Sequence, residues 1–405
     1  MNARVSKPFH VNLTATTDHE KLNLAKVMFH VNELAKLPTV EALAVMPDAC
    51  PAGQAPGTIP VGGVAKTGNA IHPGMHSADV CCSLALTNLG QVDPKLVLDT
   101  AMQVTHFGAG GRTDRIKMPR YIEARMRCNS FLAPLLGDAS AHFGTQGDGN
   151  HFLYVGRLES TGDTVVVTHH GSRKPGAMLY KQGLIEAKSY MKFMGYRDIP
   201  MHNAWMDYGT LLGENYWDAL KTIRLWTKAS HEAIHDKIAS RLNADPIDRF
   251  WNEHNFVFRR DDSFYHAKGA TPSFAGFSPD DDGRTLIPLN CAEPILIAAH
   301  ADAPNGLGFA PHGAGRNFSR KEHLSTLEGL SPEQIIKQEI GDLDFRSFNG
   351  KLDLSELPSA YKSADKARAE IDKFGLAKVT DMVIPYGSIM AGEQHKPWLK
   401  KRKAT

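Results

Sequence analysis

The spacing of apolar residues along the chain predicts three helices. Over residues 19–36, apolar side chains recur every three or four positions, the spacing that gathers them on one face of an α-helix. Residues 216–242 repeat this spacing and predict a second helix. Its buried side comprises Leu220, Ile223, Trp226, Ile234, Ile238 and Leu242. Residues 358–375 are more polar and predict a helix on the surface.

Runs of β-branched and aliphatic residues predict several strands. The segment DTVVVTHHGSR, residues 163–173, contains a continuous β-branched run that ends in two histidines and a glycine. This pattern is typical of a buried strand that presents polar residues at its carboxyl end. The segment TLIPLNCAEPILIAAH, residues 285–300, predicts two short strands interrupted at Pro288 and Pro294. A last apolar strand is predicted over residues 378–390.

Between residues 46 and 74 the composition changes to proline, glycine and alanine. This segment looks too polar and too rich in glycine for a buried element, so we expect a long loop that lines a site. The mixture of helices and strands, without an internal repeat or linker, indicates a mixed α/β fold of the α+β class. We expect a single domain over residues 1–405, with a helical insertion at about 180–245.

Composition excludes some classes of protein and leaves the partner open. Hydrophobic residues are 42% and charged residues 22% of the chain, a profile of globular enzymes rather than of disordered tails or coiled coils. No secretory leader is visible, and no apolar run approaches the roughly 20 residues that a membrane span needs. With five cysteines in no even framework, we expect a cytoplasmic protein with no membrane partner. The net charge of +2 decides nothing about nucleic acid, because a basic groove can hide in a neutral total.

Side chains of the types that bind metals occur at predicted tight turns and strand ends. They are Asp79 and Cys82 in SADVCCS, His151 in GNHF, His169 in THHGSR and His254 in EHN. A lone histidine is more often an ordinary side chain than a ligand, so each place by itself is weak evidence. Together they supply a thiolate, a carboxylate and three imidazoles, enough for two metals if Cys82 or Asp79 bridges them.

A candidate nucleophile lies in the segment HGAGRNFSR. His312 is followed by small residues, which let a phosphate approach the backbone, and then by Arg316 and Arg320. Two guanidinium groups four residues apart can face one anion if the segment is helical. Lys268 in HAKGAT adds a further cation suited to phosphate. The alternative is a glycine-rich loop with exposed arginines.

These motifs, in this order, resemble the RtcB family of RNA ligases. The resemblance runs from MPDACPAG and PVGGVA through HPGMHSADVCC, GTQGDGNHF, HHGSR, EHN, HAKGAT and HGAGRNFSR to the C-terminal strand. It implies a fold in which central β-sheets surround a deep metal cleft and are flanked by helices. Family members join an RNA end bearing a 2′,3′-cyclic phosphate or 3′-phosphate to a 5′-hydroxyl end, using GTP and manganese.

The resemblance also implies roles for individual residues. The implied ligands of two Mn²⁺ ions are Asp79, Cys82, His151, His169 and His254. His312 matches the histidine that becomes guanylylated. The implied contacts to nucleotide phosphates and the RNA end are Asn150, Arg173, Asn255, Lys268, Arg316 and Arg320. By softness alone, a thiolate with imidazoles favours Zn²⁺ or Co²⁺ over Mn²⁺, so the isolated protein could carry either of those metals.

Three positions that meet the base in the family differ here. The glutamate that reads the guanine edge is replaced by Tyr154, a base-contacting serine by Asn290, and a C-terminal lysine by Met390. A hydrogen bond to a charged group contributes about 1.5–3 kcal/mol. We therefore expect nucleotidyl transfer to survive with an altered guanine preference, or with guanine read by other contacts such as stacking on Tyr154 and pairing with Asn290.

Further departures flank the expected metal ligands. The family usually has glycine on both sides of the ligand cysteine, where this chain has Cys81 and Ser83. Cys82 keeps the offset of three residues from Asp79, so we expect Cys82 to be the ligand and Cys81 to be a packing residue. Ala267 replaces a common arginine. The chain therefore looks like a diverged branch, which would serve RNA repair or tRNA splicing.

Two other functions stay open at this point. One is a metal-dependent enzyme that processes RNA 3′-ends without sealing them, as a cyclic phosphodiesterase or a 3′-capping nucleotidyltransferase. The other is a non-catalytic RNA-binding protein of the same fold. An archease-type activator or a ribosome-repair partner is a further expectation. The basic tail KPWLKKRKAT, residues 396–405, is typical of a solvated end, with contact to RNA phosphates as the alternative.

Overall fold

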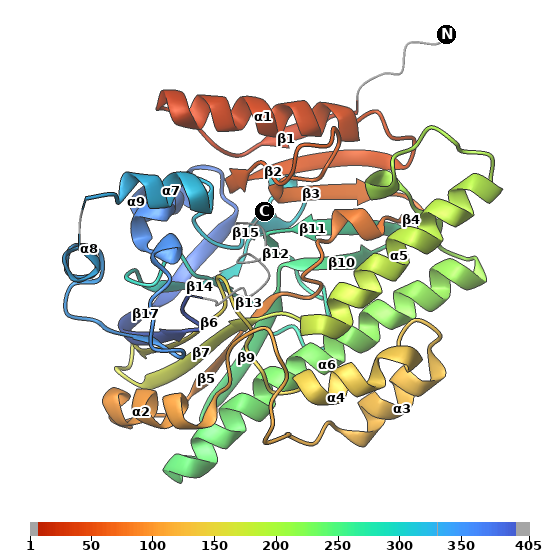
Figure 1. Ribbon diagram of the computed structural model, residues 1–405. Coiled ribbons are helices and arrows are strands. Elements are labelled where there is room, and N and C mark those ends of the chain that lie inside the picture. Colours follow the sequence, from red (N-terminus) through yellow and green to blue (C-terminus); the bar gives the residue numbers. More distant parts are fainter. Residues whose placement is uncertain (1–6, 330, 394–405) are drawn as a thin grey trace, which may run out of the picture.

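An eight-stranded sheet forms the base of the molecule in the computed structural model, which describes residues 7–329 and 331–393 (Figure 1). Its strand order is β13-β14-β17-β6-β7-β5-β9, with β16 beside β17. The strands are β5 (Ser83–Asn88), β6 (Phe152–Leu158), β7 (Thr164–His170), β9 (Asp248–Glu253), β13 (Arg284–Ile287), β14 (Ile295–His300), β16 (Asp344–Ser347) and β17 (Ala377–Met390). Neighbours are antiparallel except β16 and β17. The expectation of a mixed α and β fold is confirmed.

A second sheet of five strands lies above the first in Figure 1, in the order β1-β2-β3-β11-β10. The strands are β1 (Phe9–Val11), β2 (Val40–Cys50), β3 (Val61–Thr67), β10 (Asn255–Arg260) and β11 (Ser263–Lys268). Two small ribbons complete the strands: β4 (Ala70–Ile71) with β8 (Met206–Asp207), and β12 (Ala270–Pro272) with β15 (Phe309–Pro311). Only His254 separates β9 from β10, so the chain passes from one sheet to the other at a predicted metal ligand.

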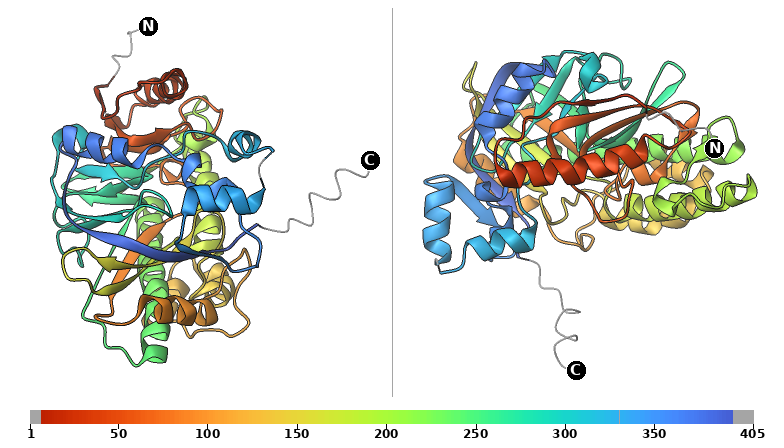
Figure 2. Two further views of the ribbon diagram at one scale, coloured as in Figure 1. Left: turned by 90° about the vertical axis from the view of Figure 1, so that its left-hand side faces the viewer. Right: turned by 90° about the horizontal axis from the view of Figure 1, so that it is seen from above.

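Helices cover the outside of both sheets (Figures 1 and 2). They are α1 (Asp18–Leu34), α2 (Pro94–Val104), α3 (Arg120–Cys128), α4 (Leu136–His142), α5 (Arg173–Phe193), α6 (Leu211–Leu242), α7 (Arg320–Thr326), α8 (Pro332–Ile340) and α9 (Ala364–Lys373). Helix α1 packs on β2, and the long helix α6 packs on β5 and β7. Among the described residues, no helix is both long enough and apolar enough to cross a membrane.

The helices and strands expected from apolar spacing are confirmed, with boundaries set by capping. Helix α1 begins after Thr17, whose hydroxyl accepts a hydrogen bond from the Glu20 amide. Helix α6 starts five residues earlier than expected because Thr210 caps it in the same way. The surface helix is shorter than expected and begins at Ala364, after Ser363, which caps α9. The strands β7, β13, β14 and β17 lie where their apolar runs place them.

The expectation of a loop over residues 46–74 is wrong for most of its length. Strands β2 and β3 pair as buried neighbours through this segment, and a register shift between Val45 and Cys50 accommodates the proline. Glycine permits the pairing to be close: a Cβ on Gly62, where φ is +71°, would lie 2.8 Å from the Ala49 amide. Composition therefore misled at Gly62 and Gly63, which serve strand contact, whereas residues 51–60 do form a loop between β2 and β3.

The segment of the expected helical insertion packs into the main body of the fold. Helices α5 and α6, with β8 between them, occupy the predicted segment, but α6 contributes Trp226 and Ile223 to the main hydrophobic core. An insertion at this place stays a prediction. The basic tail over residues 396–405 lies outside the described residues.

Candidate functional site

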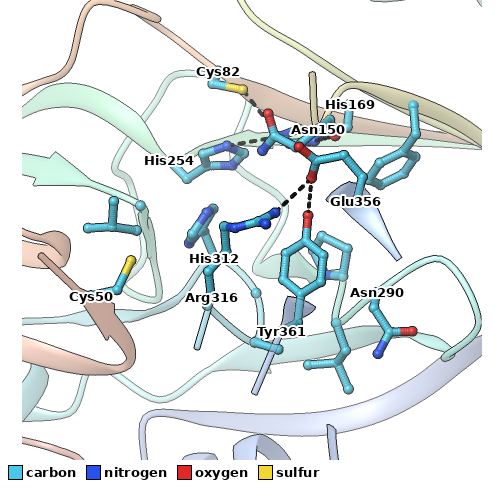
Figure 3. Close-up of a pocket in the computed structure, with 18 of the residues that line it drawn as sticks. Cys50, Cys82, Asn150, His169, His254, Asn290, His312, Arg316, Glu356 and Tyr361 are labelled. Atoms are coloured by element: carbon cyan, nitrogen blue, oxygen red, sulfur yellow. Dashed lines mark hydrogen bonds and ion pairs between the residues drawn. The ribbon is translucent and has the colours of Figure 1, made fainter. Parts of the chain in front are cut away.

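A cavity of about 430 Å³ opens between the two sheets at one edge of the eight-stranded sheet. Sticks in Figure 3 show side chains from both sheets and from the 312–316 loop pointing into it. The predicted site residues in its wall are Asp79, Cys82, Asn150, His169, His254, Asn255, Lys268, Asn290, His312, Arg316, Arg320 and Met390. His151, Arg173 and Tyr154 are not part of this wall.

Strand register explains why residues far apart in sequence meet here. Strand β5 is antiparallel to both β7 and β9, and Ser83 at its start pairs with His170 and Glu253 at their ends. Cys82 lies just before β5 and His254 lies just after β9. His169 is the second-last residue of β7, and it pairs with the first residue of β6. The same edge of the sheet therefore collects a ligand from each of four strands.

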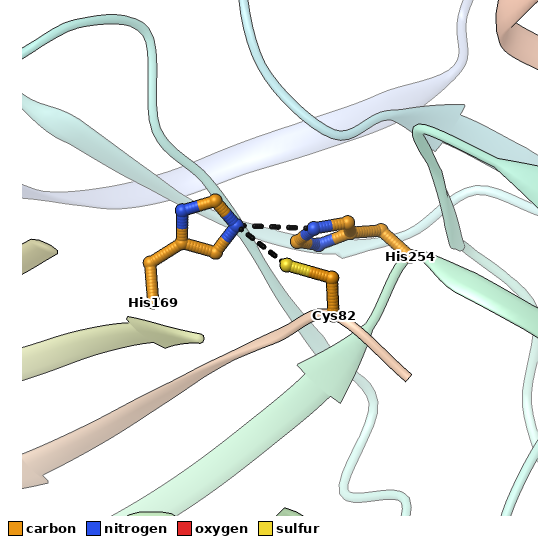
Figure 4. A group of neighbouring side chains, drawn as sticks. All are labelled: Cys82, His169 and His254. Atoms are coloured by element: carbon orange, nitrogen blue, oxygen red, sulfur yellow. Dashed lines mark hydrogen bonds between the residues drawn. The ribbon is translucent and has the colours of Figure 1, made fainter. Parts of the chain in front are cut away.

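The donor atoms approach one another closely (Figure 4). Cys82 Sγ lies 3.1 Å from His169 Nε2, which in turn lies 3.1 Å from His254 Nε2. A second group adjoins the first: Cys82 Sγ is 3.5 Å from His151 Nε2, and that nitrogen is 2.9 Å from Asp79 Oδ2. Cys82 belongs to both groups, so the structure favours the thiolate as the shared ligand.

The donor set fits a divalent cation. His169 donates Nδ1–H to the carbonyl of Asn150 at 3.1 Å, which leaves the lone pair of Nε2 for a metal. Two buried Nε2 atoms, of His169 and His254, face each other at a separation typical of ligands around one ion. Burial lowers the pKa of both imidazoles, that of His169 to about 3, so both rings are neutral as ligands must be.

The charges around the cluster agree with this assignment. Burial would raise the pKa of Asp79, but the neighbouring His151 holds it below its ordinary value, so the carboxylate is ionised. Burial and then Asp79 raise the pKa of the Cys82 thiol, and a bound cation reverses that effect. The five predicted ligands are thus assembled, and their role as ligands remains a proposal.

His312 sits beside the metal cluster, with its ring centroid 4.9 Å from that of His254. Asp48 on β2 accepts two hydrogen bonds through Oδ2, from the His312 backbone amide at 3.1 Å and from Nδ1 at 2.5 Å. A Cβ on Gly315, where φ is +74°, would lie 2.1 Å from the Asp48 carbonyl, so glycine is needed for this approach. Sequence reasoning missed Asp48, although it lies in the quoted MPDACPAG motif.

Arg316 and Arg320 share a buried carboxylate that sequence reasoning also missed. Glu356, whose side chain is fully buried, accepts from Arg316 at 3.1 Å and from Arg320 Nε at 2.8 Å. Its Oε2 also accepts from the Tyr361 hydroxyl at 2.6 Å, and Arg316 stacks over the Tyr361 ring (Figure 3). Both guanidinium groups are therefore held at the cavity wall in fixed positions.

Lys268 and Asn255 also line the cavity. Asn255 Oδ1 accepts from the Gly269 amide at 2.7 Å, and Lys268 Nζ donates to the Ile59 carbonyl at 3.1 Å. Burial lowers the pKa of Lys268 to about 8. An anion in the cavity would restore the charge of this amine.

The family model described as "tRNA-splicing ligase RtcB" matches residues 123–391, more than half of the chain. The chain belongs to the RtcB family. The tRNA-splicing ligase RtcB of Aeropyrum pernix is 24% identical, in an alignment that covers 91% of this chain and 92% of that protein. The tRNA-splicing ligases RtcB of Pyrobaculum aerophilum and Thermococcus kodakarensis are 23% and 25% identical, over 82% and 60% of this chain and 84% and 58% of the relatives.

One expected phosphate contact of the RtcB family lies elsewhere in this structure. Arg173, at φ +56°, donates to the Gly108 carbonyl at 2.8 Å and lies against Gly147. It fastens the loop before His151 instead of lining the cavity, and its charge lowers the pKa of Asp79 only as a minor contribution after His151. Asn150 lines the cavity mouth and holds His169 through its backbone carbonyl.

The positions where this chain departs from the RtcB family are divided between cavity and core. Tyr154 is 1% exposed, and its hydroxyl lies 3.2 Å from the Glu293 carbonyl and 3.1 Å from that of Val383. The expectation that Tyr154 stacks on a base is therefore wrong: it lies two residues further from the sheet edge than Phe152, which lines the cavity in its place. Asn290 and Met390 do line the wall.

Proposed function

We propose that this protein is an RNA ligase that joins a 3′-phosphate or 2′,3′-cyclic phosphate end to a 5′-hydroxyl end through a nucleotidylated His312. The observation that carries the proposal is the placement of His312, fixed by Asp48, directly beside the cluster of metal donors in one cavity. A binding module has no need for such an arrangement of neutral imidazoles, thiol and carboxylates. The names of the relatives support the same reaction class.

Asp48 prepares His312 for attack. A carboxylate only accepts hydrogen bonds, so Nδ1 carries the imidazole proton and Nε2 keeps its lone pair. Nε2 attacks the α-phosphorus of a nucleoside triphosphate, a P–N bond forms and pyrophosphate leaves. The positive charge that develops on the ring is stabilised by Asp48, which stays ionised, as in other Asp–His pairs.

The remaining steps use the cations of the wall. Lys268, Arg316 and Arg320 hold the phosphate oxygens, and a divalent metal, which the five donors would hold, would supply Lewis-acid charge stabilisation. The RNA 3′-phosphate takes the nucleotidyl group from His312, which makes an activated diphosphate and frees the imidazole. The 5′-hydroxyl then attacks the RNA phosphorus and releases the nucleoside monophosphate. A cyclic phosphate is first opened by water to a 3′-phosphate.

The nucleotide in this proposal is GTP, with a weakened preference for guanine. The acidic side chains in the cavity wall, among the described residues, are Asp79 and Glu356. Asp79 lies at the metal end, and both oxygens of Glu356 are occupied by arginines and Tyr361. Among the described residues of the wall, no carboxylate remains to accept from the N1–H and N2–H groups of guanine. The chain therefore lacks an interaction that would favour guanine by roughly 10- to 100-fold.

The metal in this proposal is Mn²⁺ at two adjacent sites that share Cys82. Zn²⁺ or Co²⁺ would compete for the thiolate and imidazoles in the isolated protein. RNA repair or tRNA splicing, a cytoplasmic location, and an archease-type or ribosome-repair partner stay predictions from the family resemblance.

Labelling of the protein tests the proposal. The pure protein is incubated with Mn²⁺ and each of the four α-labelled ribonucleoside triphosphates, and acid-labile label on the protein is measured beside His312→Ala. We expect label in the wild type, from more than GTP alone, and none in the variant. Label from GTP alone would remove the weakened guanine preference but keep the ligase. No label from any nucleotide, with a cyclic phosphate still opened, would point to the end-processing enzyme instead.

A further inference from the structure

A chain of hydrogen bonds lies buried behind the metal cluster, between α6 and the strands that carry the ligands. His231 and His235 are one turn apart on α6 and at most 1% exposed. His235 bonds to Thr87 of β5 through Nδ1 and to Thr168 of β7 through Nε2, both at 2.7 Å. His231 bonds to the same Thr168 hydroxyl through Nδ1 at 2.7 Å and to Ser83 through Nε2 at 3.0 Å.

The direction of the hydrogen bonds is fixed at the Ser83 end. Ser83 Oγ lies 3.1 Å from the Cys81 carbonyl and 3.3 Å from the His170 carbonyl, and both of these only accept. Its proton therefore points to a carbonyl, and its oxygen accepts from Nε2–H of His231. A neutral His231 then accepts at Nδ1, so the Thr168 hydroxyl donates to it.

The direction continues to the surface without a conflict. Because Thr168 donates to His231, it accepts from Nε2–H of His235, whose Nδ1 accepts from the Thr87 hydroxyl. Thr87 in turn accepts from Arg249 Nε at 2.9 Å. Burial lowers the pKa of both histidines, which agrees with neutral rings at every position. The chain is fully satisfied in one arrangement of protons, and a single missing hydroxyl leaves a buried group unpaired.

The chain is attached to the residues next to two metal donors. Ser83 follows Cys82, and Thr168 precedes His169. In the sheet Leu84 pairs with His169, so the chain joins β5 to β7 at the point where the sulfur and the imidazole approach to 3.1 Å. The RtcB family usually has glycine where this chain has Ser83, and glycine has no hydroxyl to close the connection. Packing alone would not require the hydrogen bonds of both histidines to converge on the neighbours of two metal donors, Ser83 and Thr168.

We propose that His231 and His235, acting through Thr168 and Ser83, are positioning residues that hold Cys82 and His169 at the spacing a metal ion requires. This inference rests on the metal centre of the proposed function. The ligands in question are the sulfur of Cys82 and the imidazole of His169. The chain of hydrogen bonds behind them touches neither the metal nor the substrate. Groups that hydrogen-bond a metal ligand directly change metal affinity by about 10- to 100-fold when they are lost, and we expect the same range for a chain that fixes the ligands' neighbours.

Thr168→Val tests the inference, because valine keeps the shape and removes the hydroxyl that both histidines share. Thr285→Val is the matched control: Thr285 is also a fully buried strand threonine, and its hydroxyl donates to the Pro272 carbonyl at 2.9 Å and not to a residue of the histidine chain. Metal-free proteins are titrated with Co²⁺, and affinity and the visible spectrum of the bound ion are recorded together with thermal unfolding. Ser83→Ala is a second, milder variant at the other end of the chain.

We expect Thr168→Val and Ser83→Ala to weaken Co²⁺ binding by about 10- to 100-fold and to shift its visible spectrum. Thr285→Val should lose similar thermal stability and bind Co²⁺ as the wild type does. The double variant of Thr168 and Ser83 should lose less than the product of the single losses, because the two residues belong to one chain. Wild-type affinity and spectrum in both single variants would overturn the positioning role and leave the ligase proposal standing. A wild type that binds no Co²⁺ would overturn the metal centre, and this inference with it.

Discussion

Asp48→Asn removes the negative charge behind His312 and keeps the orientation of the His312 ring. Both N–H groups of His312 converge on Asp48 Oδ2, while Oδ1 is buried without a hydrogen-bond partner among the described residues. Asparagine can place its oxygen at the Oδ2 position and its amide nitrogen at the Oδ1 position. The ring of His312 then keeps its orientation and its proton on Nδ1, and only the negative charge is lost.

The magnitude follows from that geometry. A hydrogen bond to a charged group contributes about 1.5–3 kcal/mol, and the imidazole bond gains this contribution as charge develops on the ring. Its loss should slow nucleotidylation of His312 by roughly 10- to 100-fold. Nucleotide affinity should change by less than about threefold, since Asp48 lies behind the ring and outside the cavity wall.

Single-turnover labelling measures the effect, with saturating α-labelled nucleotide and Mn²⁺ and with acid-labile label followed over time. Asp93→Asn is a suitable control, because Asp93 is a carboxylate that caps α2 away from the cavity. A rate for Asp48→Asn within about threefold of the wild type would refute the argument that the carboxylate stabilises the attacking ring. A loss confined to affinity would refute it equally.

Three further perturbations follow from the site. Nucleotide affinity, measured with a fluorescent analogue, should fall as pH rises through about 8, because Lys268 then loses its proton. Lys268→Arg should abolish that fall, because arginine keeps its charge. The same pH profile in Lys268→Arg as in the wild type would contradict the role of the amine. Glu356→Gln should lower the free energy of unfolding in urea by about 3 kcal/mol, near the low end for a broken buried pair because one arginine partner is half exposed; a loss below about 1 kcal/mol would contradict it. Gly171→Ala places a Cβ 2.1 Å from Asp79 Oδ1 and should weaken metal binding at least about tenfold. Gly110→Ala is the control, because its Cβ meets open space, and it should bind metal as the wild type does. Equal metal affinities of the Gly171 and Gly110 variants would exclude Asp79 as a ligand.

Local pattern was enough to predict seven elements, namely α1, α6, α9, β7, β13, β14 and β17, and to single out the candidate metal donors. The β-branched run of β7 sets its strand state, and its last residues fall at the sheet edge where ligands gather. Strand ends and tight turns restricted the candidates to Asp79, Cys82, His151, His169 and His254, and the structure brings all five together. The resemblance supplied their common role.

Pairs that depend on long-range packing were beyond sequence reasoning. Asp48 meets His312 across 264 positions, and only the pairing of β2 inside its sheet brings them together. Glu356 meets its arginines through a loop with no periodic pattern. Tyr154 was expected to meet the base because it matches a base-reading position of the RtcB family, but its depth along β6 leaves it buried at 1% exposure. A match of positions follows from the sequence, whereas the depth of a side chain within a sheet depends on the fold.

Joining of two RNA strands tests the central claim most directly. An RNA with a 3′-phosphate is mixed with a labelled RNA with a 5′-hydroxyl, Mn²⁺ and each nucleotide in turn, and the products are separated by length for the wild type and His312→Ala. We predict a joined product that requires a nucleotide and the wild-type histidine. Joining by His312→Ala, or no joining by a wild type that carries metal, would contradict the account.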